Sequence, residues 1–190
     1  QSSSRGLGDV YKRQPLWRQR LKASQSKEGK LASNRWIQIA NVSKNNQPRV
    51  RTVVFRGWLD NTTMLIYTDK RSEKYKDLES NKNIEVLWLF IKTKSQYRFK
   101  GKVSELEDND KYWNNLFDKS KDQWYWPSPG QKINLENSVS SRKNTLSKPN
   151  NFSVLKIKID EVDLLKLEQP FHKRYVWKKI DNWRCVEVNP

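Results

Sequence analysis

The sequence is poor in the residues that build disulfides and metal sites. Its 190 residues include one cysteine, Cys185, and one histidine, His172. A single thiol cannot form an internal disulfide, and one Cys with one His cannot supply a zinc site. We therefore expect Cys185 to be a half-buried strand residue and no metal to be bound. This cysteine usage is typical of a reducing compartment, so we expect a soluble, cytoplasmic protein.

Long apolar runs and glycine-rich loops are also missing. No apolar stretch approaches the roughly 20 residues of a membrane span, and the polar first residues give no sign of a signal peptide. The six glycines form no GxGxxG pattern, and no strand–helix–strand alternation favours a Rossmann sheet. The sequence thus argues against a membrane protein and against a glycine-rich phosphate loop.

Acidic residues are outnumbered, since 38 Lys and Arg stand against 21 Asp and Glu, a net charge of +17. With 12% aromatic residues, this excess invites a nucleic-acid-binding interpretation. The basic residues are dispersed, however, and acidic residues interrupt most clusters. Nucleic-acid binding stays an alternative, and a small phosphate-bearing cofactor fits the same excess.

The apolar residues lie in short runs that predict strands. Residues 1–14 show no periodicity and look like a cloning or sequencing-adaptor remnant, or else a native disordered tail. Residues 15–190 form one predicted domain. Strands are expected at 36–42, 50–59, 64–68, 84–90 (buried on both faces), 96–106, 152–159, 174–179 and 183–188, helices at 16–21, 72–80 and 108–118, and a long loop at 127–151. This pattern predicts a mainly β (α+β) fold, in which six or seven of these strands form an antiparallel barrel or sandwich.

Two arginines lie in the apolar run 51–56 (RTVVFR). A half-buried arginine needs an anion, and a guanidinium binds phosphate through a planar fork. The alternative is an exposed strand whose arginines pair with carboxylates. A regular strand places Arg51 and Arg56 on opposite faces, so either a bulge intervenes or they serve different sites.

The segment 67–74 (YTDKRSEK) joins a strand end to a helix start. Free backbone N–H groups and the helix dipole favour a phosphate there, and Arg71, Ser72 and Lys74 add charge and a hydroxyl group. The alternative is an ordinary helix cap by Ser72 with solvated lysines.

Gln96 begins the run 96–101 (QYRFKG). Gln96 and Arg98 share one face of the expected strand, and Tyr97 and Phe99 share the other. The amide of Gln96 offers a donor and an acceptor, which suits a flavin ring edge, although a solvent-facing polar stripe gives the same pattern.

Taken in this order, the three segments resemble the pyridoxamine 5'-phosphate oxidase family, which has an arginine-led strand, a Tyr-Thr strand end with a basic helix start, and a Gln on the following sheet. The run 171–177 (FHKRYVW) and the chain's last residues are also similar, so the resemblance extends from about Trp17 to Pro190. The RTVVFRG, RSEK and WPSPG segments are most similar to a cyanobacterial and plant-like branch.

The resemblance implies a six-stranded antiparallel split β-barrel, usually a homodimer, with FMN at the subunit interface. It assigns Arg51 and Lys74 to the FMN phosphate, with Arg71 as a replacement for an arginine that the family has in place of Glu73. Gln96 would face the isoalloxazine, and Gln131 would come from the partner subunit. The further cofactor-contacting residues that it implies are Thr52, Val53, Val54, Arg56, Tyr67, Thr68, Ser72 and Arg174.

The residues that the family uses for its vitamin substrate are mostly absent. Arg56 and His172 are the candidate substrate contacts, but Pro170 occupies the position of the arginine that the family pairs with this histidine, and His172 alone also fits a surface residue. The FMN-stacking tryptophan expected near Leu164 is missing, and the family's substrate-phosphate Tyr, Arg and Ser have no clear match within 111–123.

We therefore expect an FMN-binding oxidoreductase of unknown small-molecule substrate. Three alternatives stay open: a true pyridoxamine/pyridoxine 5'-phosphate oxidase, a flavin- or haem-binding module without turnover, and a basic single-stranded nucleic-acid binder.

Overall fold

The chain is described by a computed structural model that covers residues 14–133 and 147–190. The expected N-terminal tail therefore lies outside the described residues except for Gln14. The strands are β1 (Trp36–Val42), β2 (Pro48–Trp58), β3 (Thr63–Asp69), β4 (Asn83–Phe90), β5 (Ser95–Glu105), β6 (Phe152–Lys166), β7 (Lys173–Lys178) and β8 (Cys185–Val188). The helices are α1 (Leu16–Glu28), α2 (Glu73–Ser80), α3 (Asp110–Asn114) and α4 (Asp118–Lys121), with 3-10 turns η1 (Ala32–Asn34), η2 (Asp122–Tyr125) and η4 (Lys179–Asp181). No helix in the described ranges is long and apolar enough to cross a membrane.

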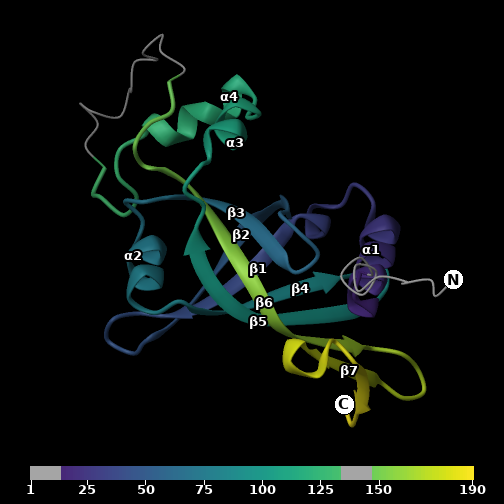
Figure 1. Cartoon of the computed structure of the whole chain (residues 1–190). Coiled ribbons are helices and arrows are strands. Elements are labelled where there is room, and N and C mark those ends of the chain that lie inside the picture. Colours follow the sequence, from purple (N-terminus) through teal and green to yellow (C-terminus); the bar gives the residue numbers. More distant parts are fainter. Residues whose placement is uncertain (1–13, 134–146) are drawn as a thin grey trace, which may run out of the picture.

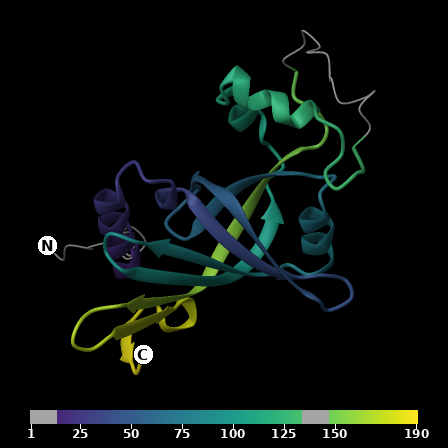
Figure 2. The same cartoon turned by 180° about the vertical axis from the view of Figure 1, so that it is seen from behind.

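The first six strands close into an antiparallel barrel. Their order is β3-β2-β1-β4-β5-β6, and β6 returns to pair with β3. Through its second half β6 also pairs with β7, so the β7–β8 hairpin extends the sheet beyond the barrel. Figure 1 shows α1 at one end of the barrel and α2 at the other. The view from behind places the C-terminal hairpin on the side away from α3 and α4 (Figure 2). The predicted six-stranded barrel with short helices is confirmed.

Side chains that alternate along the strands fill the barrel, and α1 covers one end of it. Trp17 and Leu21 of α1 are completely buried in this core. The carboxylate of Glu28, also completely buried, accepts hydrogen bonds from the backbone N–H groups of Ile91 and Lys92 at 3.1 and 3.0 Å. Because these donors lie in the turn between β4 and β5, the contacts fix the end of α1 to the barrel.

A second, smaller core lies on the outer face of β3 and β6, beneath α3 and η2. Its buried members are Leu65, Trp113, Trp124, Phe152 and Val154. Figure 1 shows α3 and α4 as a separate group on this side of the barrel. The outer face of β3 is therefore covered here by aromatic side chains and is not exposed to solvent.

The predicted ends of two elements were wrong for a common reason. The first helix continues from residue 21 to Glu28, and its buried stripe there consists of the polar residues Ser24 and Glu28. β6 continues from 159 to Lys166, although Asp160 and Glu161 interrupt its apolar alternation. In both cases, polar residues at buried or irregular positions interrupt the apolar periodicity from which a helix or a strand is predicted.

Two further predictions need correction. The helix expected at 108–118 is broken into α3 and α4, because Phe117 has extended backbone angles. β4 is not buried on both faces, since its residues alternate and Leu89 is 44% exposed. Cys185 is a free, half-buried residue of β8, as expected.

Gly101 lies where β5 and β6 change register. Lys100 pairs with Glu161 and Gly101 with Ile159, so Asp160 of β6 has no partner in this ladder. A Cβ atom at position 101 would lie 2.2 Å from the carbonyl oxygen of Lys158. Only glycine permits this approach, which lets β6 bend between its two halves.

We expect Gly101→Ala to lower the free energy of unfolding by about 1–3 kcal/mol, because the added methyl group forces two paired backbones apart. Urea denaturation measures this change. Ser104→Ala, at an exposed position of the same strand, is the control and should be nearly neutral. Equal stability of the two variants would contradict the role given to Gly101.

Candidate functional site

Arg51 lies on the inner face of β2, where it is opposite Ile39 of β1. Its Nη1 donates a hydrogen bond to Oδ1 of the buried Asn41 at 2.9 Å. Asn41 in turn donates from Nδ2 to Oδ2 of Asp77, on α2, at 3.4 Å. These contacts tie the guanidinium of Arg51 to the helix that covers this end of the barrel.

The first turn of α2 brings further polar groups to the same end. Ser72 precedes the helix, and its hydroxyl donates to the carbonyl oxygen of Asp69 at 2.6 Å and lies 3.4 Å from Oγ1 of Thr68. Nζ of Lys74 donates to Oγ of Ser72 at 3.3 Å. We call Arg51, Thr68, Ser72 and Lys74 the basic cradle.

The basic cradle has the charge of an anion site. Burial lowers the pKa of Lys74, and the nearby charge of Arg51 lowers it further. Among the described residues, neither cation forms an ion pair with a carboxylate, although Asp69 acts on Lys74 from farther away. Two cations that form no ion pair in the described part of the chain, beside a helix N-terminus, favour a bound anion such as a phosphate. The structure thus brings together four of the residues predicted to contact the cofactor.

Arg71, the third predicted phosphate ligand, makes other contacts. Its Nε and Nη2 donate to the carboxylate of Asp69 at 2.7–3.2 Å. Nη2 also donates to the carbonyl oxygen of Trp126 at 3.0 Å. These contacts join Arg71 to the segment after η2 and not to Arg51 or Lys74.

Arg56 faces surroundings that differ from those of Arg51. A bulge lies between Phe55 and Gly57, and the Arg56 guanidinium carbon is 4.9 Å from the ring centre of Tyr67. Tyr67 packs on the second core, outside the barrel. Burial lowers the pKa of Arg56; Tyr67 acts to raise it, and the charge of Arg35 lowers it further. Arg56 is therefore a second cation, on an exposed position of β2 and separate from the basic cradle.

The residues between the two arginines alternate between faces. Val53 packs against the barrel core, whereas Thr52 and Val54 are on the opposite face of β2. In the same way Thr68 belongs to the basic cradle and Tyr67 to the outer core. One ligand can meet both members of such a pair only if it contacts the backbone of one of them.

Gln96 and Arg174 form a second group, on the outer face of the sheet. The ladders of β5, β6 and β7 align Gln96, Leu165 and Arg174 in one row. Arg174 donates to the carboxylate of Asp163 at 2.6–3.1 Å, and Arg98 donates to it at 2.5 Å. Burial acts to raise the pKa of Asp163, but these hydrogen bonds hold it below its usual value. Asp163 thus fixes the orientation of Arg174. We call Gln96 and Arg174 the outer pair.

Gln131 and His172 join neither group. Both side chains are exposed. The backbone N–H of Gln131 donates to the carbonyl oxygen of Ser128 at 3.3 Å, and Nδ1 of His172 lies 3.2 Å from the carbonyl oxygen of Glu168. Their predicted roles stay predictions.

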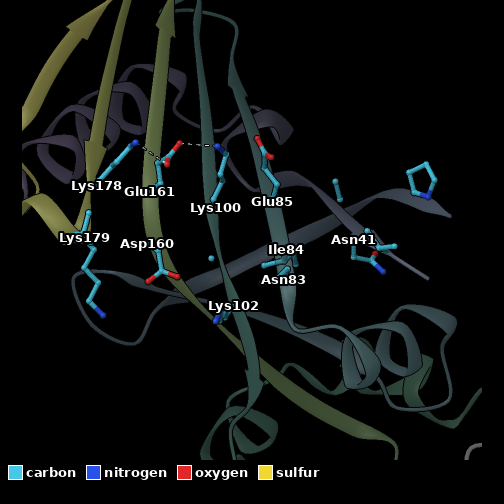
Figure 3. Close-up of a pocket in the computed structure, with 15 residues that line it drawn as sticks. Asn41, Asn83, Ile84, Glu85, Lys100, Lys102, Asp160, Glu161, Lys178 and Lys179 are labelled. Atoms are coloured by element: carbon cyan, nitrogen blue, oxygen red, sulfur yellow. Dashed lines mark hydrogen bonds and ion pairs between the residues drawn. The ribbon is translucent and has the colours of Figure 1, made fainter. Parts of the chain in front are cut away.

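A groove of about 950 Å³ crosses the outer face of the sheet (Figure 3). Glu161 lies between Lys100 and Lys178, at 2.9 and 4.0 Å, so these charges are compensated. None of the residues predicted to contact the cofactor lines this groove. It contains no member of the basic cradle or of the outer pair, although Asn41, the partner of Arg51, lies at its edge.

Three residues that organise these groups were missed by sequence reasoning. Asn41 is polar at an inward position of β1, a signal that was visible in the alternation of 36–42. Asp163 lies in the part of β6 that was not predicted as a strand. Tyr112 of α3 packs edge-on against Tyr67, with ring centres 6.2 Å apart, and only the tertiary fold brings it there.

Comparison with known proteins gives one family. The family model described as pyridoxamine 5'-phosphate oxidase, FMN-binding domain, matches residues 14–107. Pyridoxine/pyridoxamine 5'-phosphate oxidase 2 of Arabidopsis thaliana is 29% identical over 92% of this chain and 96% of its own length. A pyridoxamine 5'-phosphate oxidase-related, FMN-binding protein of Nostoc punctiforme is 26% identical, with a TM-score of 0.81 over 92% of this chain and 97% of that one.

The fold extends to more distant proteins. PhzG of Burkholderia lata, solved with tetrahydrophenazine-1-carboxylic acid, has a TM-score of 0.81 over 97% of both chains at 15% identity. The family model covers α1 to β5, and the plant and cyanobacterial relatives extend the match over most of the remaining chain. The chain belongs to the pyridoxamine 5'-phosphate oxidase-like split-barrel family.

Proposed function

We propose that this protein is an FMN-binding oxidoreductase that acts on a small anionic substrate. The observation that carries the proposal is the basic cradle, in which Arg51 and Lys74 lie close together without a carboxylate in an ion pair among the described residues. The description of the matching family model as an FMN-binding domain supports the cofactor. When bound, the flavin would supply the redox chemistry by accepting a hydride and passing the electrons on.

The basic cradle offers complementary contacts to a phosphate group. Arg51 has a planar fork that Asn41 already orients, and Lys74 adds a compact charge. Thr68 and Ser72 add hydroxyl groups, and the first turn of α2 adds backbone N–H groups and the positive end of its dipole. We infer that these groups hold the FMN phosphate.

The surroundings of Arg56 support the proposal that the substrate is anionic. This arginine is at an exposed position of β2, close to Arg35 and over the ring of Tyr67, and it forms no ion pair in the described part of the chain. A phosphate or carboxylate of the substrate would compensate this charge. Tyr112, packed against Tyr67, offers a hydroxyl group on the same side. True pyridoxamine 5'-phosphate oxidation, the activity named for the Arabidopsis relative, is the second candidate, and Pro170 in the family's arginine position weighs against it.

A second copy of the chain would complete the cofactor site. The outer pair lies on the outer face of the sheet, whereas Arg51 is on the inner face of β2. The same outer face exposes Trp36, Val50 and Leu89 at 55%, 72% and 44%, and Leu89 is directly opposite Gln96. Exposed apolar side chains on one face favour burial against a partner. We therefore propose a homodimer in which this face meets its copy, located in the cytoplasm as the cysteine usage suggests.

Arg51→Gln and Lys74→Met should each weaken FMN binding about 10- to 100-fold, because each removes a charge-assisted hydrogen bond of roughly 1.5–3 kcal/mol. Binding is measured by fluorescence titration of FMN and of riboflavin, which lacks the phosphate. Riboflavin affinity should stay unchanged. Lys22→Met, at an exposed position of α1, is the matched control.

Absence of FMN binding by the unaltered protein would overturn the cofactor assignment. Equal losses for FMN and riboflavin would overturn the phosphate role of the basic cradle. If FMN binds as expected, oxidation of pyridoxamine 5'-phosphate by the loaded protein would establish the second candidate activity.

The preference for FMN over riboflavin should fall as the pH rises. A bound phosphate dianion raises the pKa of Lys74 above its lowered value in the free protein, so binding is coupled to proton uptake. The contribution of Lys74 to the preference is then complete below its free-protein pKa, which lies under the ordinary value of 10.5, and it declines as the pH rises from there through the higher pKa of the complex. Lys74→Arg should remove this decline, since arginine stays charged. The measurement is the ratio of the two dissociation constants against pH; a decline of equal size in Lys74→Arg would refute the coupling.

Trp36→Glu should convert the dimer into a monomer and weaken FMN binding at the same time, because it places a charge on the proposed interface. Sedimentation velocity gives the mass, and the FMN titration gives the affinity. Phe117→Glu, on an 84% exposed residue between α3 and α4, should change neither. A monomeric Trp36→Glu variant with full FMN affinity would show that one copy suffices.

A further inference from the structure

Asp69 and Arg71 are the centre of a hydrogen-bonded clasp at the turn between β3 and α2. The guanidinium of Arg71 holds both carboxylate oxygens of Asp69. Nδ2 of Asn151 donates to Oδ2 of Asp69 at 3.0 Å and to the carbonyl oxygen of Trp124 at 2.9 Å. Nη2 of Arg71 donates to the carbonyl oxygen of Trp126 at 3.0 Å. The clasp therefore joins the β3–α2 turn to η2 and to the start of β6.

These contacts determine the exposure and the pKa of the Asp69 carboxylate. Its side chain is 13% exposed. Burial acts to raise its pKa, but the hydrogen bonds from Arg71 and Asn151 hold the pKa below its usual value. The charged form is thus stable in place, and its hydrogen-bond donors come from two separate segments of the chain, Arg71 in the same turn and Asn151 just before β6.

The clasp connects directly to the basic cradle. The carbonyl oxygen of Asp69 accepts hydrogen bonds from both the backbone N–H and the hydroxyl of Ser72, at 3.0 and 2.6 Å. Oγ of Ser72 then accepts the hydrogen bond from Lys74. A change in the position of Asp69 is therefore passed to Ser72 and Lys74 within two hydrogen bonds.

We propose that Arg71 is a positioning residue that fixes the basic cradle through Asp69 and does not itself contact the anion. The proposal rests on the proposed function of the cradle as a phosphate site. Nε and Nη2 of Arg71, which form the side of the guanidinium that grips a carboxylate, are already occupied by Asp69 and Trp126. The clasp depends on the planar, two-pronged geometry of the guanidinium more than on its charge.

A double-mutant cycle with FMN and riboflavin tests this role. Arg71→Ala and Asp69→Asn should each weaken FMN binding by a similar factor of about 5–10, and the double variant should be no weaker than either, because both act through one contact. Arg71→Lys, which keeps the charge but loses the fork, should not restore FMN affinity. Riboflavin affinity should stay within about twofold in all variants, which separates a lost phosphate contact from general unfolding.

The outcomes distinguish positioning from direct contact. If Arg71 touched the phosphate, Arg71→Lys would recover most of the affinity, and Asp69→Asn, which frees the guanidinium, would retain or tighten binding; either result overturns the proposal. Equal losses of FMN and riboflavin would also overturn it. If the unaltered protein binds no FMN, the proposed function itself fails, and this result differs from a loss confined to the variants.

Discussion

The pairing of β6 with β3 is the contact on which the rest of the structure depends. It closes the barrel and fixes Asp69 opposite Phe152, and so it sets the point from which α2 begins. Beyond the bend at Gly101 the same strand carries Asp163, which orients Arg174. One strand therefore positions both the basic cradle and the outer pair, although they lie on different faces of the molecule.

The arginines discussed above differ in how their charge is compensated, and this difference is the basis for proposing structural roles for some and a ligand-binding role for others. Arg98 and Arg174 share the buried carboxylate of Asp163, and Arg71 is held by Asp69. Arg51 is oriented by an uncharged amide and lies near the charge of Lys74. A cation that the fold holds in place without forming an ion pair favours the binding of an anion, which supplies the missing negative charge.

The sequence predicted the barrel because most strands alternate strictly, and it predicted the basic cradle because arginine, hydroxyl and lysine fall in the order of a known family. It missed the second half of β6 and the last turns of α1, where polar side chains such as Asp160 and Glu28 occupy irregular or buried positions. It also could not separate Arg71 from Lys74, three residues apart on one turn, because only the fold brings Asn151 to Asp69 and the carbonyl oxygen of Trp126 to Arg71. Local pattern predicts which residues form a strand or helix start; long-range contacts decide which of them stay free for a ligand.

The central claim is that the phosphate of FMN is held between Arg51 and Lys74 at the start of α2. A crystal structure of the protein with FMN tests it most directly, through the distances from the phosphate oxygens to the nitrogens of these two side chains. The account predicts hydrogen-bond distances to both, with the Asp69–Arg71 clasp unchanged. A phosphate bound elsewhere, or held by Arg71 in place of Asp69, would contradict it.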